Sequence, residues 1–203
     1  MKMSIERPAP RSENTALRPR IAPLPEAGED PQVRSLLAGW GLAEDAAVPK
    51  IFATLARHPE LLAQWDSLQR ALLLHGALPE RDRELLILRT ALNCRSAYIW
   101  GQHVSHHGPA AGLTAAEMAR IPAGVEDQGW EPADLALLRA ADELHADAAI
   151  TEPTWRELAG GYDDRQLIEL PVVVGEYHLM AFLVNVLGVE PEPGVSDLPP
   201  EIN

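Results

Sequence analysis

PERDRELLILRTALNCRSAYIWGQHVSHHG, residues 79–108, carries the clearest structural signal in the chain. It opens with Pro79, a favoured first helical residue, and places acidic side chains in the first turn. The stretch then becomes apolar on nearly every side. Because a helix that is apolar all round is a buried one, the sequence predicts that a buried helix begins here.

Helical patterns extend from this stretch in both directions. Thr114 and Glu117 have the spacing of a capping box, which predicts a helix start. The last apolar stretch, residues 163–188, contains Pro171, which predicts a kink, and 172–174 is the one place where a strand competes. Since no partner strand is evident, the sequence predicts an all-α protein.

Both ends of the chain are polar and rich in proline, which predicts extended tails around one helical domain. The predicted division is an arm at residues 1–30, a helical domain at 31–190 and a second tail at 191–203. The arm is either a disordered tail or a segment that wraps a neighbouring subunit. Its anchoring side chains in the second case are Leu17, Ile21 and Leu24.

The composition argues against several classes of binding partner and bears on the location of the protein in the cell. A net charge of −13 over 203 residues repels phosphate backbones and anionic membranes, so neither is an expected partner. No secretory leader is evident at the N-terminus, and no apolar run is expected to span a bilayer. The single cysteine, Cys94, fits a reducing compartment, so the expected location is cytoplasmic.

Glu84 is the first candidate for chemistry. On a helix it shares a face with Leu88 and Ala91, and an apolar setting would raise the pKa of its carboxyl towards neutral pH. Such a group suits general acid or base catalysis. The alternative is a structural carboxylate that complements the helix dipole or pairs with Arg81 or Arg83.

His103 is the second candidate, because an imidazole that faces a core beside polar groups can transfer protons at pH 7. The alternative is a buried histidine satisfied by a backbone carbonyl. Uniform helical periodicity puts its neighbours on one stripe, which consists of Ser96, Ile99, Trp100, His103, His106 and His107.

Further candidates are weaker. His103 and His107 have metal-ligand spacing, but no nearby carboxylate completes a ligand set, so no metal is predicted. Cys94, placed just before a helix, could have a lowered thiol pKa or simply fill space as a small buried hydrophobe. His178 lies in another apolar helix and could line the same pocket.

At residues 81–118 the sequence resembles the core of the carboxymuconolactone decarboxylase family, which includes the AhpD-like alkylhydroperoxidases. The resemblance extends over about residues 31–194. It implies an AhpD-like helical bundle that forms homo-oligomers, trimers or hexamers. AhpD-like peroxidases carry a glutamate, a Cys-x-x-Cys pair and a histidine; Glu84 and His103 match the outer two, but the cysteine positions hold Ser96 and Ile99. Peroxidase chemistry needs both sulfurs.

The decarboxylase branch needs no cysteines, so the resemblance implies cofactor-independent acid/base chemistry on a small organic acid or lactone. Glu84 and His103 would be the acid/base pair. The substrate-binding candidates are Ser96, Tyr98, Trp100, His107 and His178. Arg89 or Arg95 would hold a substrate carboxylate. Two alternatives remain open: a thiol-dependent peroxidase that uses Cys94, and a non-catalytic binding or scaffold protein.

Overall fold

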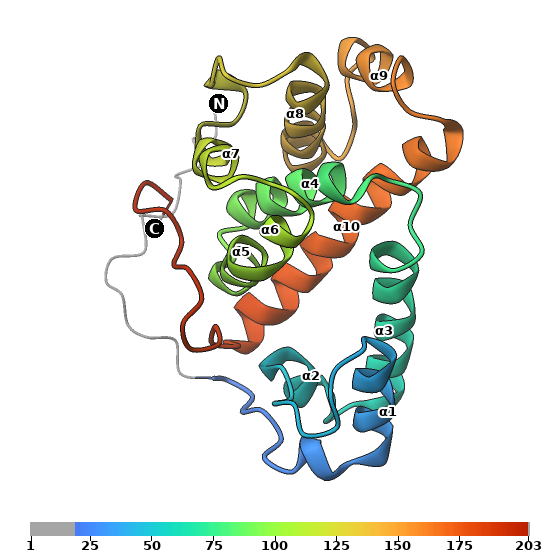
Figure 1. The fold of residues 1–203 in the computed structure, drawn as a ribbon, viewed down its shortest axis with the longest axis vertical. Helices are drawn as coiled ribbons and strands as arrows, with labels where there is room; N and C mark the ends of the chain where they lie inside the picture. Colours follow the sequence, from blue (N-terminus) through green and yellow to red (C-terminus); the bar gives the residue numbers. More distant parts are fainter. Residues whose placement is uncertain (1–18, 203) are drawn as a thin grey trace, which may run out of the picture.

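The computed structural model describes residues 19–202, and every regular element among these residues is a helix (Figure 1). This agrees with the all-α prediction. The elements in chain order are η1 (Ala27–Glu29), α1 (Pro31–Gly39), α2 (Lys50–Leu55), α3 (Pro59–Leu73), α4 (Glu80–Asn93), α5 (Ala97–Gln102), η2 (His103–His107), α6 (Gly108–Ala110), α7 (Ala115–Arg120), η3 (Ile121–Glu126), α8 (Pro132–Asp147), α9 (Glu152–Ala159) and α10 (Asp164–Leu187).

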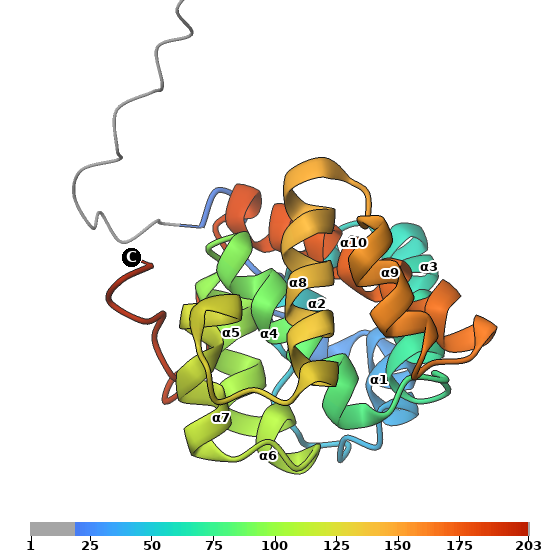
Figure 2. The same cartoon turned by 90° about the horizontal axis from the view of Figure 1, so that it is seen from above.

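Helix α4 lies at the centre of the molecule, between α8 and α10, which form its most extensive contacts (Figure 2). Its residues Leu85, Leu86, Ile87 and Leu88 are all 0% exposed. Four consecutive buried side chains cover every direction around a helix, so α4 is the all-round apolar core helix that the sequence predicts.

Two arginines tie α4 to α8. Arg81 donates to both carboxylate oxygens of Asp134, at 2.7 and 2.8 Å, and to Glu117 at 2.6 Å. Arg89, two turns further on, donates to both oxygens of Asp142 at 2.6 and 2.9 Å. These two-point contacts fix the register of α4 against α8.

Helix α10 runs from Asp164 to Leu187 with Pro171 inside it, so residues 172–174 are helical and the competing strand does not form. Asp163 and Gln166 form a capping box at its start. By length and composition α10 could cross a membrane, contrary to the expectation that no apolar stretch is long enough, although 39% of that window is buried inside the protein. It packs diagonally across α4 (Figure 1).

The described parts of both tails pack against this same chain. Arg20 N–H donates to the carbonyl of Leu187 at 2.8 Å, and Leu24 N–H donates to that of Ala53 at 2.9 Å. Leu24 is partly buried against the core, whereas Ile21 is 41% exposed. Leu17 lies outside the described residues, and the predicted domain boundaries stay predictions.

We expect Leu88→Ala to lower the free energy of unfolding by about 3 kcal/mol, because it opens a cavity in a fully buried helix. Urea unfolding monitored by circular dichroism measures the change. Leu61→Ala is the matched control: this leucine on α3 is 47% exposed, and its truncation should cost less than about 1 kcal/mol. Equal losses in the two variants would contradict the central position of α4.

Candidate active site

Glu84 and His103 meet in the interior of the protein. The Nδ1 atom of His103 lies 2.7 Å from Oε2 of Glu84, and both residues are only 4% exposed. Glu84 comes from the second turn of α4, and His103 is the first residue of η2. The structure therefore joins the two residues that the sequence singled out, and the alternative pairing of Glu84 with Arg81 does not occur, since Arg81 binds Asp134 and Glu117.

The pKa of Glu84 departs from the sequence prediction. Burial acts to raise it, but the charge of His103 and its hydrogen bond outweigh burial and hold the pKa of this carboxyl below its ordinary value. Glu84 is therefore an ionised acceptor at neutral pH, and the Nδ1–H of His103 donates to it. The remaining ring nitrogen, Nε2, has no hydrogen bond to any residue of the described part of the chain.

His103 forms part of the wall of a cavity of about 350 Å³, which Glu84 does not line. Tyr177 packs edge-on against the His103 ring, with the ring centres 5.2 Å apart. Most of the wall is aromatic or aliphatic. The aromatic members besides histidine are Trp40, Phe52, Trp65, Tyr98 and Tyr177.

The helix that carries His103 changes from an α-helix to a π-helix at this residue. The prediction that regular helical periodicity places all three histidines on one stripe is therefore wrong. Residues His103–His107 form a π-helical turn between α5 and α6, in which the N–H of Gly108 donates to the carbonyl of His103. A π turn contains more residues than an α turn and so rotates the side chains that follow it. His103 is buried, whereas His106 and His107 lie on the exposed rim of the cavity.

His107 stacks at a tilt against His103, with ring centres 4.7 Å apart. Loss of hydration and the neighbouring His103 lower the pKa of His107 to about 4. His107 is therefore a neutral imidazole at pH 7, able to donate or accept one hydrogen bond at the cavity rim.

The other predicted binding residues divide into two groups. Tyr98 lines the cavity, and its hydroxyl donates to Glu192 of the C-terminal tail at 3.1 Å. Burial and Glu192 raise the pKa of this phenol. Ser96 and Trp100 are buried but do not line the cavity, and the hydroxyl of Ser96 accepts from the N–H of Ile99 as the cap of α5.

The arginines proposed for a substrate carboxylate are not at the cavity. Arg89 is committed to Asp142 and to the carbonyls of Ile121 and Pro122, and Arg95 is exposed. No lysine or arginine lines the cavity within the described residues. Arg83, which is 6% exposed, lies next to Glu84 in the chain and is one of the charges that lower its pKa; the Nε atom of Arg83 has no hydrogen-bond partner.

Cys94 and His178 lie outside the cavity, which corrects the expectation that His178 lines it. Cys94 is the C-cap residue of α4, and the N-cap of the next helix, α5, is Ser96. Burial raises the pKa of the Cys94 thiol to about 11, so the lowered thiol pKa that the sequence allowed does not occur. His178 lies beside His145 of α8, with 2.9 Å between Nδ1 of His145 and Nε2 of His178.

Several residues at or behind the cavity wall were not found from the sequence. Trp40, Phe52 and Trp65 come from α1, α2 and α3 or their ends, where they follow ordinary core patterns. Glu176 is 4% exposed and accepts from Gln69 at 2.9 Å, and burial raises the pKa of its carboxyl. The sequence held one hint of this group: Glu176 is a single carboxylate in an apolar stretch, two residues before His178.

Comparison with known proteins supports the resemblance. Residues 59–143, which hold Glu84 and His103, match the carboxymuconolactone decarboxylase family. No curated protein matches the sequence.

Solved structures match the fold over most of the chain. An uncharacterised peroxidase-related protein from Ralstonia eutropha JMP134 with an alkylhydroperoxidase AhpD core has a TM-score of 0.73 at 19% identity, over 85% of this chain and 92% of its own. The debrominase Bmp8, in complex with 2,3,4-tribromopyrrole, has a TM-score of 0.72 at 15% identity, over 85% and 91%. A peroxidase-related protein from Silicibacter sp. TM1040 has a TM-score of 0.70 at 16% identity, over 85% and 93%. At these identities the likeness shows the AhpD-like all-α fold.

The lowered pKa of Glu84 predicts how stability depends on pH. Because the folded protein holds this carboxyl below its ordinary value of 4.5, the ionised Glu84 stabilises the fold above that pH, and this stabilisation is lost as the pH falls through the folded pKa. Glu84→Gln should therefore unfold about 2 kcal/mol more easily at neutral pH, with the deficit shrinking below the ordinary value.

Urea unfolding of both proteins between pH 3 and pH 8 measures this difference. Glu60→Gln is the control, since the side chain of Glu60 is 83% exposed and its removal should give a small difference at every pH. A Glu84→Gln deficit that stays constant down to pH 3 would contradict the ionised pair.

Proposed function

Starting from an AhpD-like helical fold whose residues 59–143 match the carboxymuconolactone decarboxylase family, we propose that the protein is a cofactor-independent acid/base enzyme. His103 is the proton acceptor, and Glu84 holds its imidazole in place. The reaction is isomerisation or lactone chemistry on a small, largely apolar molecule bound in the cavity. Decarboxylation is less favoured, because it needs a substrate carboxylate and the described cavity wall supplies no lysine or arginine to hold one. One observation carries this proposal: a buried imidazole has Nδ1 fixed by an ionised carboxylate at 2.7 Å and lies in the wall of a 350 Å³ cavity.

The arrangement favours His103 over Glu84 as the group that touches substrate. A carboxylate that accepts from Nδ1–H fixes the tautomer in which Nε2 carries the lone pair, and it stabilises the imidazolium that forms after proton uptake. In the proposed step Nε2 removes a proton from the substrate, the electron pair is left on a conjugated carbon, and the imidazolium then returns a proton to another substrate atom. Glu84 is a positioning residue in this scheme.

The cavity wall favours a neutral planar substrate over one held by its carboxylate. The wall is mostly aromatic, and it lacks lysine and arginine among the described residues. Aromatic walls bind flat rings by stacking and by burial of apolar surface. A lactone or an unsaturated ring therefore fits better than a free dianion, and the halogenated pyrrole bound by the debrominase Bmp8 belongs to this shape class.

The raised thiol pKa and the position of Cys94 argue against the alternative of a thiol-dependent peroxidase. Only a small fraction of a thiol with a pKa of about 11 is ionised at pH 7, and the thiolate is the nucleophile in peroxide reduction. Cys94 also does not line the cavity. The non-catalytic alternative keeps the cavity as a binding site without proton transfer, and the experiment below separates it from the enzyme.

Proton abstraction can be detected without knowledge of the full reaction, by exchange of substrate hydrogen for deuterium in D₂O. A panel of butenolides, unsaturated acids and pyrroles is incubated with the protein and followed by proton NMR. We expect catalysed exchange in at least one ring compound, and His103→Ala should lower the rate about 10²- to 10⁴-fold. Glu84→Gln should lower it less and shift the pH profile of the rate.

The control variant is His75→Ala, since His75 is an exposed histidine that does not line the cavity. It should exchange at the wild-type rate. A His103→Ala protein with undiminished exchange would overturn the assignment of the base. Binding of panel compounds, seen as quenching of Trp40 and Trp65 at the cavity, with no exchange by the wild type would favour the non-catalytic alternative.

We further propose that the protein acts as a cytoplasmic homo-oligomer, a trimer or hexamer, through α10. This helix exposes a stripe of large apolar side chains at helical spacing. Its members are Ile168, Val172, Leu179, Phe182 and Val186, which are 40–69% exposed. A continuous apolar stripe on one helix is the usual mark of a contact surface, and a second copy of the chain supplies an identical stripe.

Phe182→Glu should dissociate the oligomer, because Phe182 is 61% exposed at the middle of this stripe and a charge there opposes burial. Light scattering coupled to size exclusion measures the mass. Leu61→Glu, which changes a leucine on α3 that is 47% exposed, should leave the mass unchanged. A measured solution mass of 22.2 kDa for the wild type, which is the mass of one chain, would contradict the proposal.

A further inference from the structure

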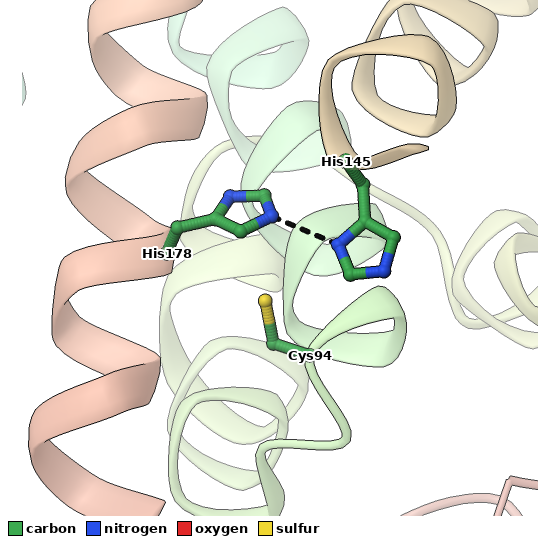
Figure 3. A group of neighbouring side chains, drawn as sticks. All are labelled: Cys94, His145 and His178. Carbon is green, nitrogen blue, oxygen red and sulfur yellow. Dashed lines mark hydrogen bonds between the residues drawn. The ribbon is translucent and has the colours of Figure 1, made fainter. Parts of the chain in front are cut away.

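Three side chains that the acid/base site does not use converge where α4, α8 and α10 meet (Figure 3). They are Cys94 at the C-cap of α4, His145 in the last turn of α8 and His178 in the middle of α10. The sulfur and one nitrogen of each imidazole all lie within 4.8 Å of one another. Figure 3 shows the two rings facing each other above the sulfur.

The hydrogen bonds of the two histidines leave a lone pair on Nε2 of His178, and a change of tautomer would leave a second one on Nδ1 of His145. His178 Nδ1–H donates to the carbonyl of Val174 at 2.8 Å, so its Nε2 carries a lone pair. That Nε2 lies 2.9 Å from Nδ1 of His145, and this contact requires one proton between them. A histidine whose second ring nitrogen is held by a backbone carbonyl is typical of metal ligands, because the hydrogen bond fixes the tautomer and the ring orientation.

We propose that Cys94, His145 and His178 form a binding site for Zn²⁺. The ligands are Sγ of Cys94, Nδ1 of His145 and Nε2 of His178. Tetrahedral zinc with bonds of about 2.0 Å to nitrogen and about 2.3 Å to sulfur places the donor atoms roughly 3.3–3.5 Å apart. The 2.9 Å contact between the imidazoles must open by a few tenths of an ångström, while the sulfur lies already within 4.8 Å.

The fourth position is open to water. Asp142, the α8 carboxylate whose charge acts on His145, is held by Arg89 at 2.6 and 2.9 Å and by Asn93 at 2.9 Å. It is therefore not free to turn towards the ion. His145 is exposed, so solvent reaches the site. Three protein ligands with one exchangeable position are the pattern of open zinc sites rather than of closed structural ones.

This site is separate from the cavity. None of its three ligands lines the cavity, although Tyr177, the residue before His178, does. Consecutive residues on a helix point in directions about 100° apart, so α10 presents Tyr177 to the cavity and His178 to α8. Occupancy of the site would clamp the C-terminal ends of α4 and α8 to the middle of α10.

Binding has a defined proton balance. Cys94 loses its thiol proton to the buffer as the S–Zn bond forms. His145 moves its proton from Nδ1 to the solvent-facing Nε2, and His178 keeps its proton on Nδ1, so the two neutral imidazoles release none. One proton is therefore released for each ion. Because a proton is released on binding, the dissociation constant should fall as the pH rises from 7 to 9.

The experiment uses full-length protein treated with a chelator and then titrated with ZnSO₄ by calorimetry in two buffers of different ionisation enthalpy. We expect one ion per chain, release of one proton, and a higher melting temperature of the zinc-bound protein. Titration with Co²⁺ should give a thiolate-to-cobalt charge-transfer band. Cys94→Ser should abolish this band, and His145→Ala or His178→Ala should weaken zinc binding about 100-fold or more.

His75→Ala is the matched control, an exposed histidine outside the cluster, and it should bind zinc as the wild type does. The proposal is overturned by wild-type protein that binds no zinc, by Cys94→Ser protein with unchanged affinity, or by binding that is lost in His107→Ala and kept in the cluster variants. The last result would place the ion on the rim histidines of the cavity. Each variant is checked for native helical content by circular dichroism, so loss of the fold is not mistaken for loss of a ligand.

Discussion

The contact of 2.7 Å between the carboxylate of Glu84 and the imidazole of His103, both almost fully removed from water, sets a strict requirement on the packing of the helices that carry them. Neither group tolerates burial alone: an isolated carboxylate would take up a proton, and an isolated imidazole would stay neutral without orientation. Together they keep Glu84 ionised and fix one nitrogen of His103. The helices must therefore hold α4 and the α5–η2 segment in one register, and the two arginines that bind α8 fix the position of α4 in that arrangement.

The π turn at His103–His107 has a direct consequence for the site. In a regular α-helix the three histidines would lie on one stripe. The wider turn keeps His103 inside and places His106 and His107 on the rim, where they are exposed. Irregular turns of this kind are often found at functional sites, because they let one side chain point differently from its neighbours. Here the turn separates the buried His103, which we propose as the base, from the exposed His107 of the cavity wall.

The side chains of α10 face three different surroundings, which are the cavity, helix α8 and the solvent. Tyr177 faces the cavity and His103, while His178 faces α8, His145 and Cys94. The outer face carries large exposed apolar side chains, of which Phe182 also lies near His178, with 6.3 Å between ring centres. One helix thus contributes to the cavity, to the thiol–imidazole cluster and to the surface that we assign to a second copy.

Periodicity, capping residues and apolar runs are local properties of a chain, and from them the sequence could predict the helical class and the burial of α4. The same patterns made Glu84 and His103 separate candidates, and the resemblance to the carboxymuconolactone decarboxylase family joined them as a pair. The direction in which the Glu84 pKa shifts, the place of Cys94 and His178 outside the cavity, and the pairing of Arg89 with Asp142 became known from the packed helices alone. Each of these depends on which helix packs against which face. That choice is made by contacts between segments far apart in the chain, where neither spacing nor propensity carries information.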